Sequence, residues 1–252
     1  MQGTQLIGRV AAVLRRVGSS GAEGVTTAEV AAATGLPRST AQRVLAALAE
    51  EGFVDRHGRW YLGPELFLLG SVAAERYDVT STARDILRSL SAKTGESAFF
   101  SARRGDETVC LAGEEGSFPL RSHVLHEGIR LPLGVASAGL AILAYLPIDD
   151  VEDYVRSRGE ELASAYGDQH AANPLTRRIT ATRRRGYAVN PGLIVPGSWG
   201  IGAVVFDRTG APAWALSLTG VESRFNGDRT AQLGTLLLEA AHTLTQRIAR
   251  RG

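Results

Sequence analysis

The first 63 residues alternate short apolar stripes with turn residues in a pattern that predicts three helices. Residues 6–16 have helical periodicity and end before a glycine. Thr26 and Thr27 are residues that favour a helix N-terminus, and Gly35 stands where a helix commonly ends. A further helix begins near Pro37, and its apolar residues recur on one face: Val44, Leu45 and Leu48. A helix, a glycine turn and a second helix in this order predict a helix-turn-helix.

The segment after the second of these helices predicts a two-stranded hairpin. Residues 53–56 and 59–62 are strand-like runs, and a polar His57-Gly58 turn joins them. Basic residues flank the turn. A hairpin in this position is a wing, so we interpret residues 1–63 as a winged helix-turn-helix domain.

The second helix of that motif begins with side chains that hydrogen-bond phosphates or base edges, which predicts that it reads the major groove of double-stranded DNA. Two alternatives remain open: a small helical core with a hairpin attached, and a winged helix used for protein contact or nucleic-acid architecture. The polar face favours sequence reading. The candidate DNA-binding residues are Thr27 in the first helix, Arg38, Ser39, Thr40, Gln42 and Arg43 in the second, and Arg56 and Arg59 in the wing.

Residues 64–77 form a separate segment after the wing. Residues 64–74 give a strongly apolar helix pattern, and a helix of this kind is not expected to stay exposed. We expect this linker helix to pair with a partner chain, as an interhelical seam does.

From residue 78 to residue 252 the pattern changes to mixed helix and strand. This order of elements predicts an α+β domain, with helices packed against an antiparallel sheet. Strands are expected at 96–101, 108–112, 118–125, 201–206 and 213–219, and helices at 80–94, 136–146, 149–158, 174–185 and 228–250.

Charge narrows the way in which the chain can bind DNA. The 252 residues carry a formal net charge of only +2. Residues 1–63 hold seven Arg against five acidic residues, and the remainder is balanced at 21 basic and 21 acidic. DNA binding must therefore depend on a local basic patch, which the two heads of a dimer would double.

Cysteine usage and hydropathy predict the compartment. The single Cys110 excludes an intramolecular disulfide and a multi-cysteine metal site, which suits a reducing cytoplasm. No apolar run reaches the ~18 residues of a membrane helix, and the N-terminus lacks a signal-peptide pattern. We expect a cytoplasmic protein with no membrane partner, no metal and no cofactor.

An enzyme is the main functional alternative. Cys110 could pair with His123 or His126, but no activating motif brackets it, and a small buried strand residue is the simpler interpretation. An acidic run suits the N-terminal end of a helix; its members are Asp149, Asp150, Glu152 and Asp153. The sequence has no phosphate-binding loop, dinucleotide-binding glycine pattern, nucleophile elbow or metal-spaced His pair. We therefore expect no catalytic residues.

The chain resembles the IclR family of bacterial transcriptional regulators along nearly its whole length. The segments that carry the resemblance are TGLPRSTAQRVLAALAEEGFV, YLGPELFLLG, LPLGVASAGLAILAYL, RRRGYAVN and GAVVFDRTGAPAWALSLTGV. The resemblance implies a winged helix-turn-helix, a linker helix and an effector domain related to GAF or PAS sensors. It also implies dimers or dimers of dimers, an inverted-repeat operator, repression more often than activation, and a small organic acid as effector.

The same resemblance implies a ligand pocket. Its start would be the turn into the small-residue helix at Ser137 and Ala138, where backbone N–H groups can hold an anion. His123 and Leu131 match apolar lining positions, and Ser217 and Thr219 match hydroxyl positions that share one face of a strand. The alternatives are that these two hydroxyls merely suit a strand and that His123 is an ordinary half-buried imidazole.

Two pocket positions differ from the family pattern. Asn190 stands where many relatives carry an acidic residue, and Gly200 stands where relatives often carry a cysteine. Losing the cysteine side chain opens volume, and the segment around residues 190–199 is unusually apolar. We therefore expect a ligand larger or less polar than glyoxylate or pyruvate, such as an aromatic acid.

Overall fold

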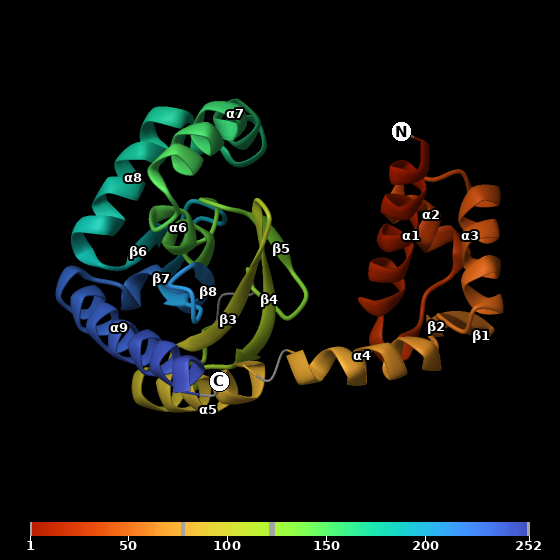
Figure 1. Cartoon of the computed structure of the whole chain (residues 1–252), viewed down its shortest axis with the longest axis horizontal. Helices are drawn as coiled ribbons and strands as arrows, with labels where there is room; N and C mark the ends of the chain where they lie inside the picture. The colour runs from red at the N-terminus through yellow and green to blue at the C-terminus, as the bar shows by residue number, and fades with distance from the viewer. Residues whose placement is uncertain (1, 77–78, 121–123, 251–252) are drawn as a thin grey trace. The chain divides into compact units, whose positions relative to one another are not determined.

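The computed structural model describes residues 2–76, 79–120 and 124–250. The chain divides into two compact units, Met1–Tyr77 and Asp78–Gly252 (Figure 1). The first unit contains α1 (Gln2–Gly18), α2 (Thr27–Thr34), α3 (Arg38–Glu50), the hairpin β1 (Val54–His57) and β2 (Arg59–Leu62), and α4 (Pro64–Arg76), with a short 3-10 turn at Gly21–Glu23. The predicted winged helix-turn-helix is confirmed.

Local sequence signals account for the helix boundaries of this first unit. The Thr26 hydroxyl accepts a hydrogen bond from the Glu29 backbone N–H, and the Glu29 carboxylate accepts one from the Thr26 backbone N–H. This capping box satisfies donors that the first turn of α2 would otherwise leave without partners. Gly35 then ends α2 at φ +66°, a conformation that side chains disfavour. Pro37 is the N-cap of α3.

The core of the first unit lies between α1, α2, α3 and the wing. Val13, Val30, Leu45 and Trp60 are all buried there. The Trp60 backbone also pairs with Val25 in an isolated antiparallel bridge, through N–H···O contacts of 2.8 and 3.0 Å. The wing is thereby attached to the segment that leads into α2.

The α4 helix leaves several large apolar side chains exposed in the single chain. Phe67 is 76% exposed and Val72 is 71% exposed, and Leu68 and Leu69 also lie at the surface. Exposed apolar side chains grouped on one helix commonly mark an interaction surface. Among the described residues, no helix is long and apolar enough to cross a membrane.

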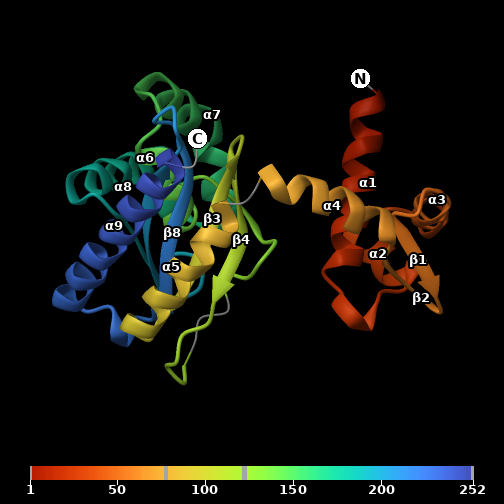
Figure 2. The same ribbon diagram turned by 60° about the horizontal axis from the view of Figure 1, so that its bottom comes forward.

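The second unit is built on one antiparallel sheet in the strand order β5-β4-β3-β8-β7-β6 (Figure 1). Figure 2 shows three of its strands, β4, β3 and β8, from another side. Its strands are β3 (Ser97–Arg104), β4 (Glu107–Glu114), β5 (Arg130–Pro132), β6 (Ala188–Pro191), β7 (Ser198–Phe206) and β8 (Pro212–Val221). Its helices are α5 (Val79–Thr94), α6 (Ser137–Ala144), α7 (Ile148–Tyr166), α8 (Ala172–Arg185) and α9 (Gly227–Arg250), with 3-10 turns at Asp168–His170 and Glu222–Arg224.

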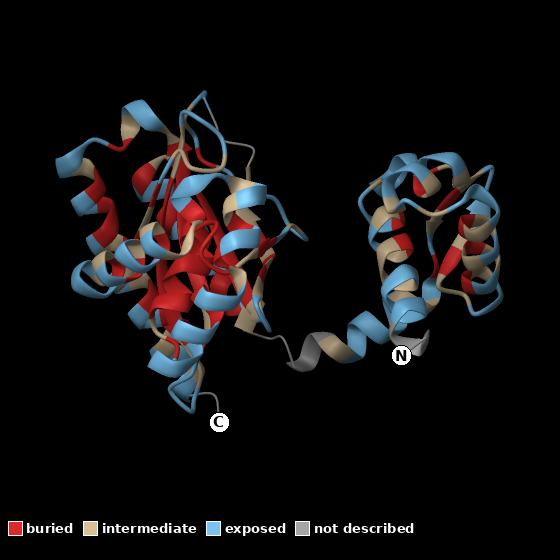
Figure 3. Cartoon of the chain, turned by 90° about the horizontal axis from the view of Figure 1, so that it is seen from above, coloured by how far each residue is buried: buried red, intermediate tan, exposed pale blue. Residues whose placement is uncertain are grey.

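Alternation along the strands gives the sheet two apolar faces. Leu216 and Leu218 of β8 pack with α5 and α9, whereas Ala215 belongs to the core beneath α6. Buried residues therefore concentrate at the sheet and the helices that cover it (Figure 3). Ser217 and Thr219 share the face of Ala215, so their hydroxyls lie on the α6 side of the sheet.

Two strand predictions fail in this unit. Residues 118–120 and 124–125 are not in a strand, and 121–123 lie outside the described residues. Phe118 instead packs beneath the Arg224 guanidinium, 4.1 Å from the ring centre, and Leu120 is exposed. The opposite error occurs at Ala188–Pro191, where the pattern predicts no strand and the structure has β6 at the sheet edge.

Candidate functional site

The N-terminal part of α3 exposes most of its predicted DNA-contacting side chains. Arg38, Ser39 and Arg43 are exposed, and Thr40 is half-buried. Ser39 and Arg43 are four residues apart and so lie on one helix face. The first unit thus presents a short polar and cationic strip.

Two other predicted DNA-binding residues are held by contacts inside the unit. The Thr27 hydroxyl donates to the Gln42 side-chain oxygen at 2.9 Å and accepts from Trp60 Nε1, also at 2.9 Å. Both residues are half-buried. Thr27 and Gln42 therefore fix α2, α3 and the wing relative to one another.

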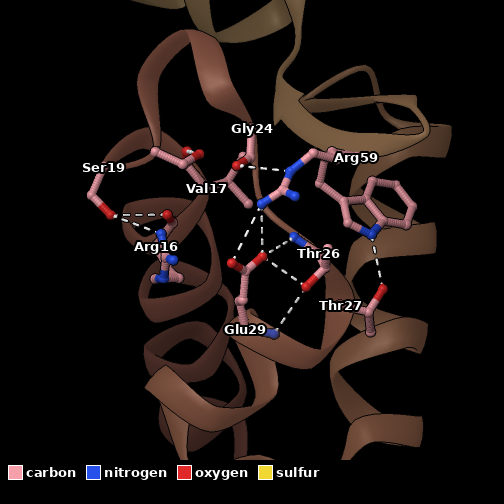
Figure 4. Close-up of polar contacts among 10 residues, drawn as sticks. Arg16, Val17, Ser19, Gly24, Thr26, Thr27, Glu29 and Arg59 are labelled. Carbon is pink, nitrogen blue, oxygen red and sulfur yellow. Dashed lines mark hydrogen bonds and ion pairs between the residues drawn. The ribbon is translucent and has the colours of Figure 1, made fainter.

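Arg59 is also held within the unit. Its guanidinium lies 3.0 Å from a Glu29 carboxylate oxygen, and its Nε donates to the Gly24 carbonyl (Figure 4). The Glu29 pKa is lowered chiefly by the Thr26 backbone N–H, then by the Thr26 hydroxyl, with a smaller contribution from Arg59. The ionised carboxylate thus neutralises much of the charge that the wing was expected to offer DNA.

Arg56 is the exposed cation of the wing. Its guanidinium lies 5.4 Å from the centre of the Trp60 ring, within the range of a cation–π contact. This contact positions the guanidinium without neutralising it. Arg56 and Arg59, alike in sequence, therefore differ in the charge that they present.

In the second unit, several predicted pocket residues meet around a small cavity between the start of α6 and strands β6, β7 and β8. Its volume is about 20 Å³, and its lining includes Ser137, Asn190, Gly200 and Thr219. A Cβ atom at Gly200 would lie 3.2 Å from the Ser137 hydroxyl, so the glycine leaves space beside that hydroxyl. The family resemblance implies a shared site for these four residues, and the structure places all four in the lining of one cavity.

The expectation that the glycine opens a large pocket is not met in this structure. Apolar side chains from the surrounding loops also line the cavity; they are Val124, Leu125, Ile194 and Trp199. These lining residues were missed, although the apolar character of residues 190–199 was a signal for two of them.

Two hydroxyls on the α6 face of the sheet are buried without a hydrogen-bond partner, and of these Thr219 lines the cavity. Thr219 is 6% exposed and Ser217 is fully buried, and neither hydroxyl oxygen has a partner among the described residues. The nearby start of α6 has Ala136 as its N-cap, with no side-chain hydrogen bond. The free backbone N–H groups at a helix start, and a buried hydroxyl without a partner, are both stabilised by an anion or a hydrogen-bonding ligand.

Asn190 has a structural role. Its side-chain nitrogen donates to the Val135 carbonyl at 2.7 Å, and its side-chain oxygen accepts from the Leu193 backbone N–H at 2.9 Å. The amide thereby connects the segment before α6 to the loop after β6. A carboxylate at this position could not donate to a carbonyl.

The remaining predicted pocket residues lie away from the cavity lining. Leu131 packs in the core beneath α6, and Ala138 is buried in α6 itself. Ser217 pairs with Gly202 on β7, where a Cβ would come within 2.5 Å of the Ser137 carbonyl oxygen. Ser217 thus lies beneath the contact of α6 with the sheet. His123 lies outside the described residues.

The side chains considered as candidate catalytic groups lie in positions that do not suit catalysis. Cys110 is buried, and burial raises the pKa of its thiol to about 12, so the nucleophilic thiolate is not formed near neutral pH. His126 is exposed on a loop. Asp149 and Asp150 occupy the first turn of α7, where they complement the helix dipole.

These two units define a class of protein: a winged-helix DNA-binding head joined to a small-molecule-binding domain. The chain matches the IclR helix-turn-helix domain over residues 7–58 and the bacterial transcriptional regulator IclR C-terminal domain over residues 71–246. The chain belongs to the IclR family of transcriptional regulators, and it is a regulator and not an enzyme.

Individual relatives support this assignment. The chain is 27% identical to the HTH-type transcriptional regulator KipR of Bacillus subtilis, over 89% of this chain and 90% of that protein. It is 28% identical to the transcriptional repressor IclR of Escherichia coli, over 88% of this chain and 82% of that protein. The crystal structure of an IclR regulator from Alicyclobacillus acidocaldarius superposes with a TM-score of 0.77, at 26% identity, covering 96% and 98% of the two chains.

Proposed function

We propose that this protein is a repressor whose affinity for its operator changes when a small organic anion binds between α6, β7 and β8. The observation that carries the proposal is the buried Thr219 hydroxyl, which lines the cavity beside the uncapped start of α6 and has no partner among the described residues. A buried polar group left without a partner costs about 1–3 kcal/mol, so a ligand that supplies the partner is favoured. The repressor role is supported by the similarity to the Escherichia coli repressor.

The chemistry around the cavity favours an anion with an apolar body. The start of α6 and the Thr219 hydroxyl suit a carboxylate, whereas Leu125, Ile194 and Trp199 suit an aromatic or branched carbon skeleton. A cavity of about 20 Å³ holds little more than one water molecule. Binding must therefore displace some of these apolar side chains, and that displacement gives the ligand a preference for one conformation over another.

The DNA-binding part of the proposal rests on α3 and the wing. Arg38, Ser39 and Arg43 would contact base edges or phosphates in the major groove, and Arg56 would contact the backbone beside it. Thr27 and Gln42 would hold α3 in position through their mutual hydrogen bond, and Thr40 would lie at the edge of the strip.

Self-association is part of the same proposal. The exposed apolar side chains of α4 support a dimer, and a two-fold dimer would read an inverted repeat. A dimer of dimers would use further surfaces. The regulator would act in the cytoplasm, where bacterial DNA lies.

Fluorescence anisotropy with duplexes from the region upstream of the chain's own gene tests the DNA-binding residues. Arg43→Ala should weaken operator binding by about 1–3 kcal/mol and leave binding to unrelated duplexes nearly unchanged. Arg184→Ala on exposed α8 is the matched control, with no change expected. An equal loss on all duplexes would reassign Arg43 to phosphate contact.

Alanine variants of the two wing arginines should differ in the salt dependence of DNA binding, measured on the same duplexes. Arg56→Ala should reduce the slope of log K against log salt concentration by about 1 for each head. Arg59→Ala should reduce that slope less, because Glu29 already neutralises its guanidinium. Equal reductions would show that Arg59 leaves Glu29 when DNA binds.

Thermal-shift measurements against a panel of organic acids test the ligand. Aromatic or branched carboxylates should raise the melting temperature of the full chain and change its operator affinity. Thr219→Val should abolish the change in operator affinity, whereas Thr243→Val on the exposed side of α9 should retain it. Stabilisation by two- and three-carbon acids alone would contradict the proposed ligand class.

A further inference from the structure

A second and much larger cavity opens at the β6 edge of the sheet. Its volume is about 650 Å³, and its lining residues come mainly from α8, β6 and the start of α9. These three elements are labelled in Figure 1. Ligand sites commonly have volumes of about 300–1,000 Å³. This α8–α9 cleft can therefore hold an organic molecule in the conformation that the structure has, whereas the 20 Å³ cavity at α6 cannot.

The α8–α9 cleft is cationic. Arg177, Arg178 and Arg185 line it from α8, and no Asp or Glu from the described parts of the chain is among its lining residues. A concave surface with one sign of charge and apolar walls raises the local concentration of ions of the opposite sign. The charge of the cleft thus favours an anion.

Arg178 lacks most of the hydrogen bonds that a buried guanidinium requires. Its Nε and Nη2 atoms are buried and have no partner among the described residues, and its Nη1 makes one long contact of 3.5 Å to the Gln169 carbonyl. Burial lowers the Arg178 pKa to about 10, so the side chain remains charged at neutral pH. The Thr230 hydroxyl, which also belongs to the lining, is likewise buried without a partner. An unpaired buried charge is costly unless a ligand pairs with it.

The remaining walls of the cleft are flat and apolar. Tyr187, Trp199 and Phe225 contribute aromatic rings, and Trp199 and Phe225 lie with ring centres 6.4 Å apart. The Arg185 guanidinium stands 5.9 Å from the centre of the Tyr187 ring. Aromatic rings of this kind favour a planar apolar skeleton.

From these observations we propose that the α8–α9 cleft is a second binding site of this regulator, and that it takes a flat aromatic carboxylate. The carboxylate would accept hydrogen bonds from Arg178 and Thr230, and the ring would pack against Trp199 and Tyr187. This site is separate from the proposed α6 site and does not depend on it. Trp199 lines both cavities, so an occupant of one would contact a wall of the other.

Titration of the full chain with 2-naphthoate tests the proposal. Calorimetry measures the affinity, and quenching of tryptophan emission reports contact with Trp199. Arg178→Met should raise the Kd for 2-naphthoate by about tenfold or more, the loss expected for a hydrogen-bonded charge pair. Arg184→Met, which removes the same charge from the exposed side of α8, should leave the Kd within about twofold. The neutral 2-naphthamide should bind as weakly to the wild type as 2-naphthoate binds to Arg178→Met.

Stability measurements separate a binding role of Arg178 from a structural role. Without ligand, Arg178→Met should unfold at a urea concentration equal to or above that of the wild type, because the variant no longer buries an unpaired charge. A lower midpoint would show that Arg178 stabilises the fold and would overturn the proposal. Trp199→Phe should retain binding and lose part of the quenching.

Variants of the α6 site complete the test. Thr219→Val should leave the naphthoate affinity of the cleft unchanged, even if the α6 site proves to bind nothing. If Thr219→Val no longer bound naphthoate while Arg178→Met bound it as tightly as the wild type, the ligand would lie at α6 and the proposal would be overturned. A change in sedimentation of Arg178→Met, with naphthoate affinity unchanged, would make the cleft an interface between copies of the chain, which also overturns it.

Discussion

The head and the effector unit treat their buried polar groups in opposite ways. In the described part of the head, every buried side-chain nitrogen and oxygen has a hydrogen-bond partner. In the described part of the effector unit, Thr219 of the α6 cavity and Arg178 and Thr230 of the α8–α9 cleft keep buried atoms without one. Outside these two linings the same is true of Thr82, Arg158, His170, Ser217 and Arg229. The internal hydrogen bonds of the head are therefore satisfied without DNA, and they fix the surface that carries its predicted DNA-contacting residues. Three of the unpaired polar side chains of the effector unit line the α6 cavity or the α8–α9 cleft, as expected of sites that a ligand completes.

Loss of the central head side chain should have the largest effect on stability. Trp60→Ala should destabilise the head by about 3–5 kcal/mol, because it removes a buried aromatic side chain and the partner of Thr27. Hydrogen exchange followed by mass spectrometry should show faster exchange in residues 5–63 and unchanged exchange in the sheet of residues 97–221. Unchanged exchange in the head would show that Trp60 does not hold the wing.

Matched threonine substitutions test the comparison directly. Thr27→Val should destabilise the head by about 1 kcal/mol or more, because its hydroxyl both donates and accepts. Thr219→Val should leave the effector unit equally stable or stabilise it by up to about 1–3 kcal/mol, because it removes an unpaired buried hydroxyl. Urea unfolding of the two variants measures both changes. A destabilised Thr219→Val would show that its hydroxyl has a partner in solution.

His170 makes the effector unit sensitive to acid. Its ring is buried, and burial and then Arg178 lower its pKa below the ordinary value of about 6.5. Below pH 6.5 the His170 ring binds a proton more readily in the unfolded chain than in the folded unit. Stability should therefore fall as pH drops below about 6.5, by at most ~1.4 kcal/mol per pH unit.

Urea midpoints of the effector unit between pH 7 and pH 5 measure this dependence. His170→Gln should flatten it, because the amide does not titrate. An equally steep fall in that variant would assign the acid sensitivity to another group.

The smallest effect is expected at the exposed Glu29–Arg59 pair. Glu29→Gln should lower the melting temperature of the head only slightly, because the amide oxygen can still accept from the Thr26 backbone N–H and only the carboxylate charge is lost. Because the Glu29 pKa is lowered in the folded head, this contribution is present above the ordinary pKa of about 4.5 and is lost as pH falls through the folded value. The melting temperatures of wild type and variant should therefore differ at pH 7 and approach each other as the pH is lowered to 3.

The head was the more predictable unit because its signals are local. Thr26, Gly35 and Pro37 act within one helical turn, and the structure confirms the boundaries that they indicate. The interactions of Arg59 were not predictable, because Glu29 lies 30 residues away along the chain. An exposed arginine in a wing and a paired one have the same sequence pattern.

The effector unit was less predictable because its elements depend on distant partners. Residues 118–125 have the apolar spacing of a strand, yet Phe118 is covered by Arg224 and Leu125 joins the core from a loop. The strand β6 is short and gains its hydrogen bonds only by pairing with β7 at the sheet edge. Neither outcome has a local signal.

Periodicity, caps and turns act over a few residues, so the sequence by itself determined the winged head and the α+β effector domain. The shared site of Ser137, Asn190, Gly200 and Thr219 was implied by the family resemblance, because no local pattern joins residues so far apart in the chain. Only the tertiary structure decided which buried polar groups have a hydrogen-bond partner within the chain and which do not. It closed the α6 cavity with loop side chains, neutralised Arg59 and brought Arg178 of α8 to a cleft shared with Thr230 of α9. Burial and pairing depend on residues far apart in the chain, and those distances are set by packing.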